Sequence, residues 1–290
     1  MDWNLLISQL VNSIQLGLLL FLLASGLTLI FGIMDFINLS HGSFFTGIIV
    51  GLVGIFFLGA LVEWLIARRL YKENHLDHVL VTFGLILVFD ALVHLIWGPS
   101  GLSIPLPDFL NGQIQFGSLV FPVYRLVIIS GGLAVAGILY LLISRTRLGM
   151  LIRAGASNRD MVESLGININ RLFLFVFALG AAMAGFAGML IAPITEATIG
   201  MGNDIIIIAF VVVIVGGIGS IKGAFYVALM IGFIDTMSRS YLDDFIELLV
   251  STAAAETAAP AISAMLVYVL MAVVLAFKPT GLFPPTAGNR

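Results

Sequence analysis

The sequence contains no cysteine and few charged residues, and both absences limit what the protein can do. Without cysteine there is no disulfide bond, no thiolate nucleophile and no cysteine-ligated metal. Charged residues make up 10% of the 290 residues, whereas a soluble domain has roughly 25%. Hydrophobic residues make up 60%, and the mean hydropathy is +1.15. This composition predicts a polytopic membrane protein and leaves no polar stretch long enough for a separate soluble catalytic domain.

Common enzyme signatures are missing as well. The chain has no H-E-x-x-H zinc motif and no G-x-S-x-G nucleophile turn, so no motif supports an enzyme. The stretch GGIGSIKG at 216–223 is not a phosphate loop, because Lys222 precedes a glycine rather than a serine or threonine. His41 has no further histidine or carboxylate at a suitable metal-ligand spacing. We therefore expect no cofactor and no metal on this chain.

Apolar runs of about the twenty residues that span a bilayer recur along the chain. They lie at 12–32, 44–66, 79–97, 124–144, 172–192, 205–221, 223–238 and 261–277. The seventh run is short and is expected to be tilted or partial. The amino terminus lacks a basic region and a cleavage site, so the first run should remain as a membrane helix. We predict an all-α polytopic membrane protein with about eight transmembrane helices, in a single domain over residues 1–290.

Positive charges predict the orientation of these helices, because basic connections face the cytoplasm. Basic residues gather at 67–78, at 145–171, at Lys222 and after the last run, and these places hold eleven of the thirteen lysines and arginines. Alternate counting puts all of them on one side. The opposite connections are acidic and lie at 98–123, 193–204 and 239–260. The 145–171 loop and both termini are therefore predicted to be cytoplasmic.

The basic 145–171 loop contains a candidate docking helix. Ser157 followed by Asp160 is a capping-box-like start, and Gly166 ends the turn. A small apolar face is formed by Met161, Val162 and Leu165. A helix of about two turns is too short to be stable alone in water. It must dock, either on its own membrane domain or on another protein.

The apolar run after this loop has small residues on one helical face. They recur at steps of three and four, at Ala178, Ala181, Gly185, Gly188 and Ala192. Small side chains on one face let two membrane helices approach closely. We therefore predict that Ala181, Gly185 and Gly188 pack against another helix. A docking helix joined to such a helix could pass force from outside the membrane to its interior.

Two stretches interrupt the apolar pattern, at 36–44 and at 216–223. Irregular backbone at membrane depth is tolerated only where protein or a water-filled cavity satisfies it. Paired breaks in the two halves of a transporter point to its pathway, whereas the alternative is that both are ordinary turns. The candidate pathway residues are Asn38, His41, Gly42, Gly216, Gly217, Gly219 and Ser220.

Asp90 and His94 share one face of the third run. A charged residue inside the membrane costs at least about 2.5 kcal/mol, so it usually has a function or a partner. The pair predicts either a proton relay, and with it a proton-coupled secondary transporter, or two mutually hydrogen-bonded side chains. Their position near the outer end of the run favours the second alternative. Glu63 is likewise expected to pair with Arg68 or Arg69.

Several stretches together resemble the permease subunits of bacterial branched-chain amino acid ABC importers. The matching stretches are GLTLIFGIMDFINLSHGSFF (26–45), VEWLIARRLY (62–71), TFGL (82–85), RTRLGMLIRAGASNRDMVESLGININRL (145–172), GAAMAGFAGML (180–190), VVVIVGGIGSIKGAF (211–225) and KPTGLF (278–283). They follow one another in order over nearly the whole chain, which makes the resemblance more specific than any single motif.

The resemblance implies a transport subunit that forms half of a translocation pathway for branched-chain amino acids. It implies two ATP-binding subunits that carry ATP and Mg and hydrolyse the ATP, a second related permease and a periplasmic solute-binding protein. It also implies an inner-membrane location, and no nucleic-acid partner is expected. Residues implied to contact the ATP-binding subunit are Arg153, Ala154, Ser157, Asn158, Gly166 and Ile167. Related permeases carry urea, short amides or other amino acids, and these remain alternatives.

The chain departs from the family pattern at one place. Family members usually have a longer region before the glutamate that corresponds to Glu63, long enough for an additional helix. Here only twenty residues separate Gly42 from Glu63. Either this member has lost a helix or the sequence is a deleted variant, and the topology of the amino-terminal part depends on which is true.

Overall fold

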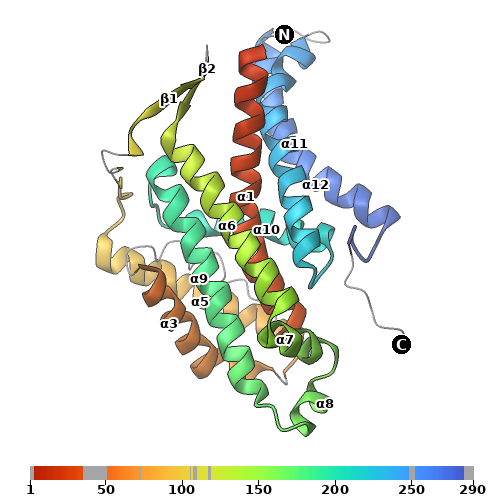
Figure 1. Cartoon of the computed structure of the whole chain (residues 1–290). Coiled ribbons are helices and arrows are strands. Elements are labelled where there is room, and N and C mark those ends of the chain that lie inside the picture. Colours follow the sequence, from red (N-terminus) through yellow and green to blue (C-terminus); the bar gives the residue numbers. More distant parts are fainter. Residues whose placement is uncertain are drawn as a thin grey trace.

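A computed structural model shows a bundle of long helices with short helices at one end and a small β-hairpin at the other (Figure 1). It describes residues 3–34, 51–71, 73–104, 106, 110–116, 119–247 and 252–283. The elements are α1 (Trp3–Met34), α3 (Gly51–Val62), the π-helix η3 (Glu63–Ala67), α4 (Arg68–Leu70), α5 (His75–Trp97), β1 (Gln113–Phe116), β2 (Leu119–Pro122), α6 (Val123–Arg145), α7 (Arg147–Ser157), α8 (Arg159–Ser164), α9 (Ile169–Thr195), α10 (Met201–Gly216), α11 (Ile221–Glu247) and α12 (Thr252–Phe277).

Among the described residues, six helices are long and apolar enough to cross a membrane. They are α1, α5, α6, α9, α11 and α12. The all-α polytopic prediction is therefore confirmed. Two expected runs correspond to shorter helices, α3 with 12 residues and α10 with 16, so the number of spans stays a prediction.

The prediction that the seventh run forms a short or partial helix is wrong. The run belongs to α11, which has 27 residues. The apolar run stops at polar residues, but the helix continues through them, and Arg239 pairs there with Asp235 one turn earlier, at 2.9 Å. A break in hydropathy was therefore not a break in the helix.

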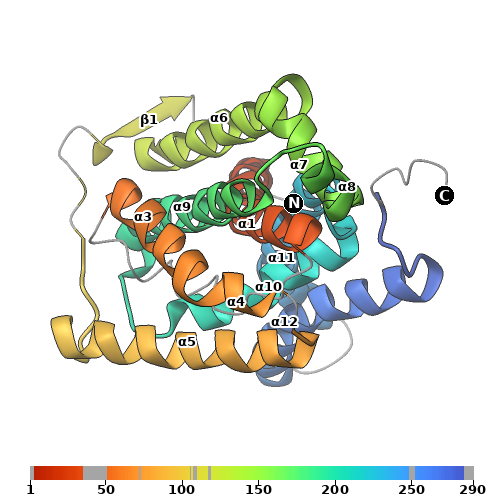
Figure 2. The same cartoon turned by 90° about the horizontal axis from the view of Figure 1, so that it is seen from below.

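Helix α1 is the centre of the bundle, between α6, α9 and α11 (Figure 2). Its side chains from Leu18 to Ala24 are all buried, whichever way they point. It crosses α11 very closely: a Cβ atom added at Gly232 would lie 2.7 Å from the Cα of Gly17. Neither glycine was predicted to pack helices, although Gly17 follows Ser13 by four residues, the spacing that allows close approach in membranes.

The small-residue face of α9 packs against α3 at Ala181 and Gly185. Ala181, Gly185 and Gly188 are buried. A Cβ atom added at Gly59 of α3 would lie 2.5 Å from the Cβ of Ala181, and one at Gly185 would lie 3.0 Å from Cγ2 of Ile55. The two backbones are therefore closer than larger side chains would allow.

The amino-terminal end of α1 lies at the hairpin end of the bundle, opposite α7 and α8 (Figure 1). Arg125 at the start of α6 donates a hydrogen bond to the side chain of Asn12 there. This differs from the prediction that the amino terminus shares the side of the 145–171 loop. Alternate counting assumed one full crossing of the membrane between the end of α1 and the basic connection at 67–78. In the structure, however, α1 and α4 both end near the 145–171 loop. Residues 35–50, which join α1 to α3, lie outside the described residues.

Candidate functional site

The basic loop after α6 folds into two short helices. Thr146 caps α7, because its hydroxyl accepts a hydrogen bond from the Gly149 amide at 3.1 Å. Asn158 caps α8 in the same way, accepting from the Met161 amide at 3.0 Å. The prediction of Ser157 as the cap is therefore wrong by one residue, since Ser157 is the last residue of α7. Helix α7 was not predicted, because its basic and polar residues are also typical of a connection between helices.

The predicted apolar face of α8 is divided between two directions. Val162 points into the protein and is 4% exposed, whereas Met161 is 63% and Leu165 71% exposed. The chain then turns at Gly166, whose φ of 81° confirms the predicted helix stop. Met161 and Leu165 are therefore large apolar side chains left uncovered on an otherwise polar helix. We call Met161 and Leu165 the α8 tip.

The residues implied to contact an ATP-binding subunit surround this tip, but not all of them are free to do so. Arg153 is exposed, yet its guanidinium donates a hydrogen bond to the Ile143 carbonyl at the end of α6. The Ala154 carbonyl accepts from the Asn158 amide at 2.9 Å, and the Ile167 amide donates to Val162 at 3.4 Å. Their contacts hold α7 and α8 together, while their role in docking stays a prediction.

The loop is linked to the bundle by aromatic and charged side chains. Arg159 of α8 lies over the ring of Phe173 near the start of α9, with its guanidinium carbon 4.9 Å from the ring centre. Tyr71, which follows α4, meets the same ring edge to face, with the ring centres 5.3 Å apart. Phe173 is 1% exposed. The two basic connections, 67–78 and 145–171, therefore lie at the same end, as predicted.

Tyr71 continues this link to a buried carboxylate, Glu63. The Tyr71 hydroxyl donates to Glu63 Oε1 at 2.8 Å, and Arg68 pairs with Glu63 Oε2 at 3.0 Å. Glu63 is 0% exposed, and a buried carboxylate with a single partner would not recover the free energy lost when its charge leaves water. Burial and the adjacent carboxylate raise the pKa of Tyr71, so its hydroxyl stays protonated and can donate. The predicted pairing of Glu63 is confirmed with Arg68, but the contribution of Tyr71 was missed.

The break at 216–223 is a tight turn closed by the segment after α12. The Leu282 amide donates to the Val215 carbonyl at 2.8 Å, and the Phe283 amide donates to the Gly216 carbonyl at 3.2 Å. Gly281 lies directly against Gly217. Protein thus satisfies the carbonyls that end α10.

The remaining candidate pathway residues lie either in the α10–α11 turn or outside the described residues. In the α10–α11 turn, Gly219 has a φ of 83°, and the Ser220 hydroxyl accepts from the Gly223 amide at 3.1 Å. Asn38, His41 and Gly42 lie outside the described residues. The role of all seven residues in a pathway stays a prediction.

Asp90 is bonded to another helix rather than to His94. The side-chain amide of Asn203 on α10 donates to Asp90 Oδ2 at 3.2 Å, whereas the His94 side chain is exposed. The expected mutual pair is therefore wrong. The reason is that Asn203, distant in sequence, reaches Asp90 from the first turn of α10. Over the described part of the chain, no three His, Asp or Glu side chains gather as metal ligands would.

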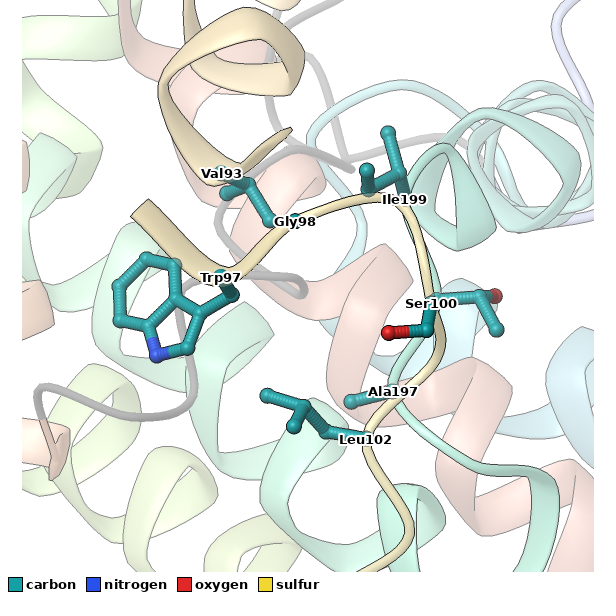
Figure 3. Close-up of a pocket in the computed structure, with 8 residues that line it drawn as sticks. Val93, Trp97, Gly98, Ser100, Leu102, Ala197 and Ile199 are labelled. Atoms are coloured by element: carbon teal, nitrogen blue, oxygen red, sulfur yellow. The ribbon is translucent and has the colours of Figure 1, made fainter. Parts of the chain in front are cut away.

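A small cavity lies where α5 ends, beside the loop between α9 and α10 (Figure 3). Leu102 and Ala197 form an isolated pair of backbone hydrogen bonds at its edge, each 2.9 Å long. The cavity volume is about 20 Å³, which is enough for about one water molecule. It is too small for an amino acid.

The bundle of apolar helices, closely packed through small residues, is that of a polytopic α-helical membrane protein. The profile of the family described as branched-chain amino acid transport system, permease component, matches residues 43–275. LivH of the high-affinity branched-chain amino acid transport system of Escherichia coli is 30% identical over 274 residues, covering 81% of this chain and 87% of LivH. BraD of Pseudomonas aeruginosa is 27% identical over 307 residues, covering 95% of each chain. No solved structure matches the chain.

The chain belongs to the branched-chain amino acid permease family. It is a membrane permease subunit of the ABC-importer type, and a transport protein rather than an enzyme. The resemblance drawn from its motifs is confirmed. A probable LivM permease of Methanocaldococcus jannaschii is also similar, at 27% identity over 239 residues.

Proposed function

We propose that the chain forms half of a translocation pathway for branched-chain amino acids and is driven by separate ATP-binding subunits that grip α8. The observation that carries this proposal is the α8 tip, where Met161 and Leu165 are exposed on a short capped helix. Similarity to LivH and BraD supports the substrate class. Urea, short amides and other amino acids are the alternative substrates.

The assembly proposed around this chain has two ATP-binding subunits, a second related permease and a periplasmic solute-binding protein. ATP and Mg bind the partners and not this chain. Similarity to both LivH and LivM proteins supports two kinds of permease. The location is the inner membrane, with the 145–171 loop in the cytoplasm because its basic residues favour that side. Since the start of α1 lies at the opposite end, the amino terminus then faces outward.

Docking of α8 is tested by purifying the chain together with the ATP-binding subunits. Met161→Asp and Leu165→Asp place a charge in a buried apolar contact, so each should lower retention of those subunits about tenfold. The matched control is Val120→Asp, because Val120 is 46% exposed at the hairpin end of the bundle. Equal retention by all three variants would refute docking through α8.

Two further measurements separate the proposal from its rivals. The chain has no cysteine, so Ser157→Cys provides a single labelling site, which should react from the cytoplasmic side and be protected by the ATP-binding subunits. Labelling from the other side would overturn the orientation.

Accumulation of leucine in liposomes by this chain alone, driven by a proton gradient, would establish a secondary transporter instead. Bonding of Asp90 to Asn203 rather than His94 supports the ATP-driven alternative.

A further inference from the structure

We propose that Phe173, Tyr71 and Glu63 form a joint that carries the movement of α8 to η3 and α3, as well as to α9. This inference rests on the proposed function, because it needs a partner that moves α8. It assigns a positioning role to three side chains outside the docking surface.

The joint begins at a ring that is held from two sides. Arg159 of α8 lies 4.9 Å from the centre of the Phe173 ring, and Tyr71 meets that ring with centres 5.3 Å apart. A cation above an aromatic ring and an edge-to-face ring pair are both directional attractions. Phe173 is 1% exposed, so it has little room to move away when α8 shifts. Displacement of Arg159 is therefore delivered to Phe173 and through it to Tyr71.

Tyr71 passes the displacement on through a buried hydrogen bond. Its hydroxyl holds Glu63 at 2.8 Å, and Arg68 holds the same carboxylate at 3.0 Å. A bond to a fully buried charge is costly to leave unmade, so Glu63 follows Tyr71. Nε2 of His78 on α5 lies 2.7 Å from the Leu70 carbonyl, which keeps the end of α4 in place.

Glu63 is the first residue of η3, where the regular helical bonding of α3 changes to the wider π pattern. The Arg68 amide donates to the Glu63 carbonyl there. Such wide turns are frequent at functional sites. The joint therefore ends where the regular hydrogen bonding of α3 is interrupted. Helix α9, by contrast, receives movement from α8 directly through residues 165–168.

Fluorescent labels on η3 and on α9 distinguish the route through the joint from the direct route between α8 and α9. Trp64 of η3 is 57% exposed, and Asn170 in the first turn of α9 is exposed. Trp64→Cys and Asn170→Cys each carry a polarity-sensitive fluorophore in the assembled importer, with the ATP-binding subunits and the binding protein loaded with leucine. Addition of ATP should change the emission of both labels in the otherwise unaltered chain.

Phe173→Leu removes the ring and keeps an apolar side chain. We expect the ATP-dependent change at Trp64→Cys to fall about fivefold or more, with the change at Asn170→Cys retained. Leucine transported per ATP should fall by a similar factor. The matched control is Phe175→Leu, on the same helix, whose ring lies 6.2 Å from that of Phe56 of α3 and outside the joint. This control should keep both responses.

Tyr71→Phe tests the joint without loss of a ring, so it serves even if Phe173→Leu folds poorly. It removes the bond to Glu63 and should also lower the Trp64→Cys response selectively. An unchanged response in Tyr71→Phe, or equal loss at both labels, would overturn the joint and leave the proposed function standing. No response at either label in the otherwise unaltered chain, or no retention of ATP-binding subunits, would overturn the proposed function and the joint with it.

Discussion

Close packing of α3 on α9 makes a quantitative prediction about added methyl groups. At Gly59, a new Cβ would lie 2.5 Å from the Cβ of Ala181 and 3.3 Å from the Cα of Ala178. Neither atom can rotate away, so the helices must separate. At Gly185 the new Cβ meets the side chain of Ile55, most closely its Cδ1, with Cγ2 at 3.0 Å and Cβ at 3.3 Å. The Cδ1 methyl is the far end of a side chain and can turn away, so less of this strain falls on the two backbones.

These geometries set the order of the expected free energies of unfolding. Overpacking costs about 1–3 kcal/mol, and we place Gly59→Ala at about 3 kcal/mol and Gly185→Ala at about 1 kcal/mol. Replacing glycine by alanine in a helix returns about 1 kcal/mol of helix propensity. The net result is a loss of about 2 kcal/mol for Gly59→Ala and little change for Gly185→Ala. Gly137 on α6 has no atom within 4 Å of a new Cβ, so Gly137→Ala should gain about 1 kcal/mol.

The measurement is unfolding in mixed micelles with increasing dodecyl sulfate, followed by circular dichroism. Ala181→Gly combined with Gly59→Ala should recover most of the lost free energy, since the clash is then removed. Gly59→Ala as stable as Gly137→Ala would refute the close approach of α3 and α9. Failure of Ala181→Gly to restore stability would place the clash elsewhere.

Three other substitutions test single features. Asn158→Ala removes the cap of α8, which is worth about 1 kcal/mol, so retention of the ATP-binding subunits should fall about fivefold. Asn158→Ser keeps a capping hydroxyl and should retain them nearly as well as the unaltered chain. Equal retention by the two variants would argue against the cap. Gly281→Ala should destabilise the protein by about 2 kcal/mol, because φ is 84° and the new Cβ would lie 2.6 Å from the Cα of Gly217. Gly98 has a similar φ of 82°, but a new Cβ there would meet open space. Chemical unfolding should therefore show a smaller loss of unfolding free energy for Gly98→Ala. Asp90→Asn should leave the pH dependence of leucine uptake unchanged, and a shifted pH profile in proteoliposomes would revive the proton relay.

Features that depend on composition or short-range pattern were predictable. The helical membrane fold followed from long apolar runs, and the packing face of α9 followed from small residues at steps of three and four. The stop at Gly166 was predictable because glycine readily adopts the positive φ that it has there. Such signals are contained within one or two helical turns.

Features that depend on irregular geometry or on distant partners were not predictable. The pairing of Glu63 with Arg68 was predicted from their proximity in sequence, but the π-helix that makes it possible was not. Residues five apart point about 140° apart on a regular helix, and the π-helix brings these two side chains into contact. The bond from Asn203 to Asp90 joins two helices whose contact no local pattern reveals. The exposed direction of Met161 and Leu165 depended on how α8 lies against the bundle.

The closure of the α10–α11 turn by Leu282 and Phe283 has a consequence for biogenesis. Chains emerge from the ribosome amino terminus first, so α10 and α11 enter the membrane before the residues that complete their turn have been made. Until then, the carbonyls of Val215 and Gly216 need water or the insertion machinery as a temporary partner. A nascent chain that has not yet reached Leu282 therefore holds α10 and α11 without the two hydrogen bonds that complete their turn.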